Sequence, residues 1–176
     1  MNKNLKLNIG ITLWTLTSKE IRRFMRIWVQ TLVPPAVTMT LYFVIFGSLI
    51  GPRIGEMDGF DYVQFMIPGL IMMSVITGSY ANVVSSFYSV KFQKSIEELL
   101  ISPMPNWVIL LGFILGGVTR GILVGIIVFC VSLFFYPEFQ IVNIGLTITV
   151  LLLTSVLFAL MGFINAVLQI VLMIYQ

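Results

Sequence analysis

Four long apolar stretches constrain this chain more than any other feature of its sequence. They span about residues 27–50, 62–90, 107–135 and 141–168, and Arg120 is the only charged residue within them. A helix needs about 20 apolar residues to cross the ~30 Å hydrocarbon core of a bilayer. Charged residues make up only 10% of the chain, against about 25% in a soluble domain. We therefore expect an all-α membrane protein, a polytopic helical bundle with four transmembrane helices and no soluble domain.

The distribution of basic residues predicts the orientation of these spans. Six of them precede the first apolar run, and two more, Lys91 and Lys94, follow the second run. The loop after the first run carries Arg53 against Glu56, Asp58 and Asp61. Because Lys and Arg concentrate in cytoplasmic segments, residues 1–26 and the loop 91–106 are expected in the cytoplasm. The transmembrane domain then covers 27–176.

Residues 13–28 have the pattern of an interfacial amphipathic helix. At 3.6 residues per turn, basic side chains gather on one face and apolar side chains on the opposite face. The basic face consists of Lys19, Arg22, Arg23 and Arg26, and the apolar face of Leu13, Trp14, Ile21, Phe24, Met25 and Trp28. Such a helix lies in the headgroup plane of a membrane. Pro34 and Pro35 are expected to break or restart the helix before the first span proper.

The loop between the second and third runs contains a second short amphipathic segment. Ser95 and Glu98 form a capping-box pattern, which favours a helix start. Ser102, Pro103 and Pro105 end whatever follows. Two interpretations remain open from the residues alone: a tight connector, or a docking helix for a cytoplasmic partner.

Small residues recur at helical spacing inside the spans, which favours close packing of membrane helices. The third run contains Gly112, Gly116, Gly117, Gly121 and Gly125, and the fourth contains Ser155, Ala159, Gly162 and Ala166. For both runs we expect packing within a bundle. The second run has a small, polar stripe of Ser74, Gly78, Asn82, Ser85 and Ser89. This stripe could also line a path or a subunit interface.

Arg120 lies about 20 Å along the third span, which predicts a position near the bilayer centre. An arginine there costs about 2.5–3.5 kcal/mol on the insertion scale and should face protein or water. No acidic residue lies within the four spans. Its partner could be backbone carbonyl groups, another subunit or a segment outside this sequence. Its role could be structural anchoring or a part in a translocation path.

Several kinds of chemistry find no support in the sequence. The chain has no histidine and a single cysteine, Cys130, within an apolar run. Glu56, Asp58 and Asp61 read as a solvated loop rather than a metal site. No P-loop motif is present, so nucleotide hydrolysis by this chain is not expected. We predict no catalytic, cofactor-binding or metal-binding residues, no nucleic-acid partner, and therefore no enzyme.

Several ordered segments resemble the permease subunit of type-2 ABC exporters, as found in bacterial inner membranes. They are KEIRRFMR over 19–26, VPP over 33–35, Phe46-Gly47 with Ile50-Gly51, FMIPGL over 65–70, and SIEELLISP over 95–103 with Gly112 beyond it. The last segment is similar to the family's signature after its second span. The resemblance covers roughly residues 12–168.

The resemblance implies a function and partners for these segments. In that family the short helix after span two is a coupling helix, which sits in a groove of a separate ATPase subunit and is braced by the N-terminal helix. The implied coupling residues are Ser95, Ile96, Glu97, Glu98, Leu99, Ser102 and Pro103, with Glu97, Glu98 and Leu99 as the expected contacts. Two permeases and two ATPases form such an exporter, so a homodimer is implied, with ATP and magnesium on the partner. Lipids, polysaccharides and drugs are substrates associated with the family, and no residue here selects among them.

The end of the chain departs from the family pattern. Family members have six spans, whereas residues 141–175 continue without charge to Gln176. We therefore expect a shortened product that lacks spans five and six, which could be an inactive remnant of a permease. A membrane scaffold is the alternative from another class, and a gene for a P-loop ATPase beside this one would favour the permease. An intramembrane enzyme is disfavoured, because no catalytic pair lies within the spans.

Overall fold

The computed structural model describes residues 8–57, 59–93, 101–102, 104–137 and 143–174. In these residues helices dominate, and the elements follow in the order α1 (Ile9–Arg26), α2 (Trp28–Tyr42), η1 (Phe43–Ile50), α3 (Gly51–Ile54), β1 (Glu56–Met57), β2 (Phe60–Asp61), α4 (Tyr62–Phe92), α6 (Asn106–Phe135) and α7 (Ile144–Ile174). Four helical segments are long and apolar enough to cross a membrane: Trp28–Ile54, Tyr62–Phe92, Asn106–Phe135 and Ile144–Gln169. The prediction of a polytopic helical membrane protein is confirmed.

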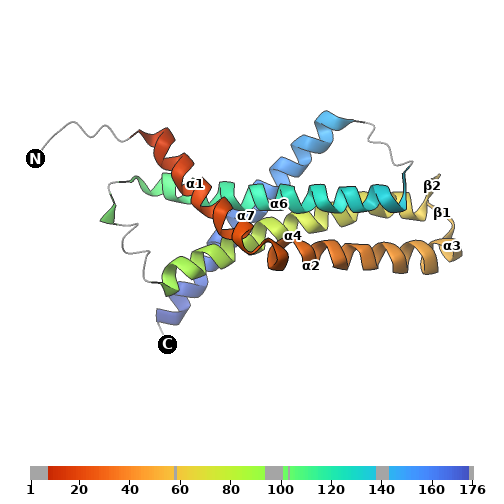
Figure 1. The fold of residues 1–176 in the computed structure, drawn as a ribbon, viewed down its shortest axis with the longest axis horizontal. Helices are drawn as coiled ribbons and strands as arrows, with labels where there is room; N and C mark the ends of the chain where they lie inside the picture. Colours follow the sequence, from red (N-terminus) through yellow and green to blue (C-terminus); the bar gives the residue numbers. More distant parts are fainter. Residues whose placement is uncertain (1–7, 58, 94–100, 103, 138–142, 175–176) are drawn as a thin grey trace, which may run out of the picture.

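α4 and α6 form the centre of the bundle. Figure 1 shows α2 and α4 each running beside α6, with α7 crossing α4 and α6 obliquely and α1 departing from the start of α2 at an angle. One group of buried side chains joins α2, η1, α4 and α6, around Met39, Phe43, Ile67 and Val128. A second group joins α4, α6 and α7, around Val83, Phe113 and Ala159.

Small residues bring the central helices together, as the sequence predicts. A Cβ at Gly117 would stand 2.5 Å from Val83 Cγ2 and 3.0 Å from the carbonyl oxygen of Ser79. At Gly162 it would stand 2.9 Å from the carbonyl oxygen of Tyr80. All four small residues of the fourth run are buried. Close backbone approach of this kind is how membrane helices pack without a hydrophobic driving force.

The first span differs from the prediction in where it begins. We expected Pro34 and Pro35 to break or restart the helix, but α2 contains both prolines. The break between α1 and α2 lies at Ile27 instead, where ψ is 35°. The hydroxyl of Thr31 donates to the carbonyl oxygens of Phe24 and Ile27, both at 3.2 Å. A helix inside a bilayer keeps its remaining backbone hydrogen bonds because lipid offers no substitutes, which favours continuation through the prolines.

The far end of the first span closes in a short hairpin. η1 has π-helical hydrogen bonding, and α3 follows it with Pro52 near its start. β1 and β2 pair antiparallel, Glu56 opposite Asp61 and Met57 opposite Phe60. Gly55 and Gly59 have φ values of 76° and 81°, which favour glycine because it lacks Cβ. Glu56 and Asp61 are exposed, as expected of a solvated loop.

Candidate functional site

The candidate site is a buried polar cluster where α1 meets α4 and α6. α1 turns Leu16, Thr17, Glu20 and Phe24 into the bundle. Leu16 lies over Gly112 of α6, and Glu20 Cβ is 2.7 Å from the point where a Cβ would stand at Gly116. Any side chain at these two glycines would displace α1. The pair of glycines therefore forms the seat of the N-terminal helix.

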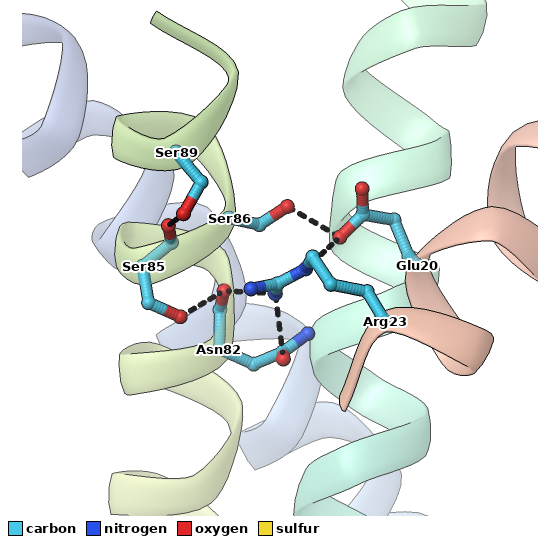
Figure 2. A network of polar contacts seen from close by, with 6 residues as sticks. All are labelled: Glu20, Arg23, Asn82, Ser85, Ser86 and Ser89. Atoms are coloured by element: carbon cyan, nitrogen blue, oxygen red, sulfur yellow. Dashed lines mark hydrogen bonds and ion pairs between the residues drawn. The ribbon is translucent and has the colours of Figure 1, made fainter. Parts of the chain in front are cut away.

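Glu20 is the centre of the cluster, with a relative exposure of 1%. Its Oε2 atom lies 3.2 Å from Nε of Arg23, three residues along the same helix. The hydroxyl of Ser86 on α4 donates to the same oxygen. Figure 2 shows the carboxylate directed at both groups. A buried carboxylate requires such partners, because an unpaired charge away from water is costly.

Arg23 carries the network from α1 onto α4. Its Nη2 atom donates to the carboxamide oxygen of Asn82 at 3.0 Å and to the Asn82 carbonyl oxygen at 3.2 Å. Ser85 donates to the same carbonyl at 3.1 Å, and Ser89 donates to the Ser85 carbonyl at 2.8 Å. Asn82 is fully buried. Charge-assisted hydrogen bonds of this kind are stronger than neutral ones, so α1 is tied to α4 as well as seated on α6.

Arg120 lies at the side of this cluster, on α6. Its Nη2 atom donates to the carbonyl oxygen of Thr31 in the first turn of α2, at 3.4 Å. Of the alternatives left open by the sequence, a backbone carbonyl partner is the one observed. Within the described part of the chain, four buried side-chain atoms have no hydrogen-bond partner: Thr17 Oγ1, Ser79 Oγ, Asn82 Nδ2 and Arg120 Nε.

The interfacial helix divides differently from the prediction. Lys19, Arg22 and Arg26 are exposed, but Arg23 points into the bundle. The apolar face also separates, because Phe24 is buried while Trp14 remains 71% exposed. α1 thus has three faces: one against α4 and α6, one apolar and exposed, and one basic. The basic face and the exposed apolar face correspond to the two predicted faces, and the third face packs α1 against the bundle.

Most of the predicted coupling residues cannot be placed. Ser95, Ile96, Glu97, Glu98, Leu99 and Pro103 lie outside the described residues. Ser102 is described and forms a partly buried bend. In the sequence the segment lies between the end of α4 at Phe92 and the start of α6 at Asn106, and α1 packs on both of these helices. The polar stripe of the second run is divided, since Ser74, Gly78 and Asn82 are buried while Ser85 is exposed.

Sequence reasoning missed Glu20 and Ser86. One signal for Glu20 was present, because it is the only acidic residue before Glu56 and stands three residues before Arg23. Ser86 lies four residues after Asn82, on the same face of a helix. The carboxylate of Glu20 is held by Arg23 and Ser86. The arrangement is suited to holding helices together rather than to acid–base chemistry.

An apolar cavity of about 1020 Å³ lies between α4, α6 and α7. Phe65, Met72, Ile126, Phe129 and Leu151 are among its lining residues, and none of the described residues that line it is charged. It lies in the half of the bundle away from the polar cluster, since its α4 residues end at Val75.

Comparison with known proteins identifies relatives of the chain. The ABC-2 type transporter family profile matches residues 12–173. "Inner membrane transport permease YadH" of Escherichia coli K12 is 60% identical over 157 residues, which cover 89% of this chain and 61% of that protein. The proteins of the same name from E. coli O157:H7 and Shigella flexneri match equally well. The chain thus spans about three fifths of the length of these relatives. No solved structure matches it at a significant level.

Proposed function

The chain belongs to the ABC-2 type transporter family, and we propose that it is the membrane-spanning permease subunit of an ATP-driven exporter in a bacterial inner membrane. The observation that carries the proposal is the extent of the family match. Residues 12–173 include most of α1 and all four candidate spans. The 60% identity to proteins named inner membrane transport permeases supports the same location and role.

In this proposal, the permease does not hydrolyse ATP. A separate cytoplasmic ATPase subunit binds ATP and magnesium and docks on the segment 95–103, with Glu97, Glu98 and Leu99 as contacts. The positions of α4 and α6 support this arrangement, because α4 ends at Phe92 and α6 begins at Asn106, on either side of that segment in the sequence, at the end of the bundle where α1 packs. Two permeases pair, and movement of the docked segments rocks the spans.

The exposed basic side chains of α1 favour a cytoplasmic N-terminus. Lys19, Arg22 and Arg26 are exposed at the end of the bundle that carries the segment 95–103, and Lys91 lies in the last turn of α4 at the same end. By the positive-inside rule this end faces the cytoplasm. The hairpin with Glu56 and Asp61 then faces the opposite side.

Co-purification with an ABC-type ATPase from the same genome tests the proposal. We expect the unsubstituted chain to retain the ATPase, and the charge reversal Glu97→Lys with Glu98→Lys to weaken binding about tenfold or more, or about 1.4 kcal/mol. The matched control reverses Glu56 and Asp61, two exposed carboxylates of the hairpin. Failure of the unsubstituted chain to bind any such ATPase would contradict the proposed function. Equal loss in both double variants would contradict the assigned docking segment.

A further inference from the structure

α1 rests on α6 through two contacts that repeat at the same spacing. Leu16 lies over Gly112 and Glu20 over Gly116, so the two helices run in the same direction here. Both glycines offer a similar notch, because neither has a side chain. Positions four apart lie about one turn, or 5.4 Å, apart on each helix. These two contacts alone would therefore also accept α1 in a register one turn away.

The contacts with α4 distinguish the registers. Glu20 receives the hydroxyl of Ser86, and Arg23 binds Asn82, so α1 and α4 run antiparallel. A slide of one turn toward the start of α6 would bring Glu20 level with Val90, whose side chain is apolar and buried. A carboxylate has no donor in such a side chain, and burying it there is costly. The contacts of Glu20 therefore oppose this register.

A slide in the other direction meets different groups. It would bring Glu20 level with Asn82 and Arg120, where Asn82 Nδ2 and Arg120 Nε are buried donors without hydrogen-bond partners in the described part of the chain. Arg23 would leave the Asn82 carboxamide and come level with Gly78, which has no side chain to bind it. This is the competing register, and the present contacts of Glu20 and Arg23 oppose it.

We propose that Glu20 and Arg23 are positioning residues that fix α1 in a single register on α4 and α6. A buried ion pair is a weak source of stability, and its best-attested use is to select one register among several. Because α4 ends at Phe92 before the segment 95–103 and α6 begins at Asn106 after it, a fixed α1 holds these two helix ends at one separation. This consequence rests on the proposed function, whereas the register itself does not.

The register is measurable by double electron–electron resonance between spin labels on α1 and α6. The label sites are Arg22 and Phe134, both exposed, the latter by 84%, in a Cys130→Ala background. They lie about 24 Å apart along α6, given the pairing of Glu20 with Gly116. The reference protein is expected to show one distance. Glu20→Gln and Arg23→Gln should each add a population about 5 Å shorter, as the competing register requires.

Two further variants test whether the hydrogen bond and the position of the charge determine the register. Ser86→Ala removes one hydroxyl and no charge, and should add the shorter distance to a smaller extent. Arg26→Gln is the matched control, because it removes the same charge from an exposed position of the same helix, and should leave the single distance unchanged. A single, unchanged distance in Glu20→Gln, Arg23→Gln and Ser86→Ala would overturn the proposal. So would an equal change in Arg26→Gln.

A second readout separates this proposal from the proposed function. In a complex with its ATPase, Arg23→Gln should lower the ATP hydrolysis of the complex severalfold at unchanged ATPase binding, whereas Arg26→Gln should not. An unchanged rate would contradict the link between register and docked segment. If no ATPase binds the unsubstituted chain, the proposed function fails, and the spin-label distances still decide the register.

Discussion

Gly117 is the position where the packing of the bundle can be tested most directly, because α4 and α7 both approach it. A Cβ there would stand 2.5 Å from Val83 Cγ2, 3.0 Å from the Ser79 carbonyl oxygen and 3.4 Å from Ala159 Cβ. Carbon atoms at optimal contact are about 3.5–4.0 Å apart. Gly117→Ala therefore forces α6 and α4 apart, since the Ser79 oxygen belongs to a helix backbone and cannot rotate away.

The expected cost follows from two opposing terms. Overpacking a well-filled site costs about 1–3 kcal/mol, while replacing a helical glycine by alanine gains up to about 1 kcal/mol. Gly69→Ala isolates the second term, because Gly69 lies within α4 and nothing stands within 4 Å of the added methyl group. The difference in unfolding free energy between the two variants is then the steric term, about 1–3 kcal/mol.

Reversible unfolding in mixed micelles of a mild detergent and dodecyl sulfate measures this difference. We expect Gly69→Ala to match or exceed the unsubstituted protein and Gly117→Ala to unfold at lower dodecyl sulfate. Equal unfolding free energies for the two alanine variants would refute the reasoning that a glycine contact sets the distance between α4 and α6. Gly162→Ala, which would approach the Tyr80 carbonyl oxygen at 2.9 Å, is expected to behave like Gly117→Ala.

Two further predictions concern charge and orientation. Arg120→Leu should leave the unfolding free energy within about 1 kcal/mol of the reference or raise it. The hydrogen bond from Arg120 to the Thr31 carbonyl oxygen contributes little stability compared with the cost of placing a guanidinium in a span. A loss above about 2 kcal/mol in the same dodecyl sulfate titration would contradict this and show a stronger partner. In a Cys130→Ala background, a membrane-impermeant thiol reagent applied to intact spheroplasts should label Glu56→Cys at once and Gln93→Cys only after permeabilisation, and the reverse pattern would overturn the assigned orientation.

The sequence predicts the spans well because a single physical requirement determines them. A stretch of about 20 apolar residues has to cross the hydrocarbon core as a helix. The predicted ranges 62–90 and 107–135 accordingly differ by at most two residues from Tyr62–Phe92 and Asn106–Phe135. The packing role of the small residues in α6 and α7 is equally predictable from the sequence, because small residues at four-residue spacing in a membrane helix favour close helix packing.

The polar cluster could not be predicted to the same extent. Helical periodicity assigns Arg23 to the same face as Lys19 and Arg26, but it does not state which neighbour that face meets. Only the fold shows that Asn82, 59 positions later, accepts from Arg23. The partners of Glu20 depend in the same way on the antiparallel placement of α4 beside α1. Long-range pairing of this kind leaves no periodic signal within either helix.

The contact between Arg120 and Thr31 also shows how far the start of α6 is displaced from the start of α2 along the bundle. Arg120 lies 14 residues after the start of α6, about 21 Å, whereas Thr31 lies only three residues after the start of α2, about 5 Å. The first turns of α6 therefore extend some 16 Å beyond the start of α2, and α1 packs along this extension at Gly112 and Gly116.

This offset bears on the depth of the charged groups. Counted from Phe135 at the far end of α6, a ~30 Å hydrocarbon layer reaches to about Gly116. We infer that Arg120 lies about one turn inside this end of the layer rather than at the bilayer centre, where counting from Trp107 alone would put it. Glu20 and Arg23, level with Gly116 and Asn82, then stand at the boundary itself. A charge near the membrane boundary can extend toward the interface at lower cost. The offset between α2 and α6 therefore lets α1 pack on α6 and also places the Glu20–Arg23 ion pair where burying its charges costs less.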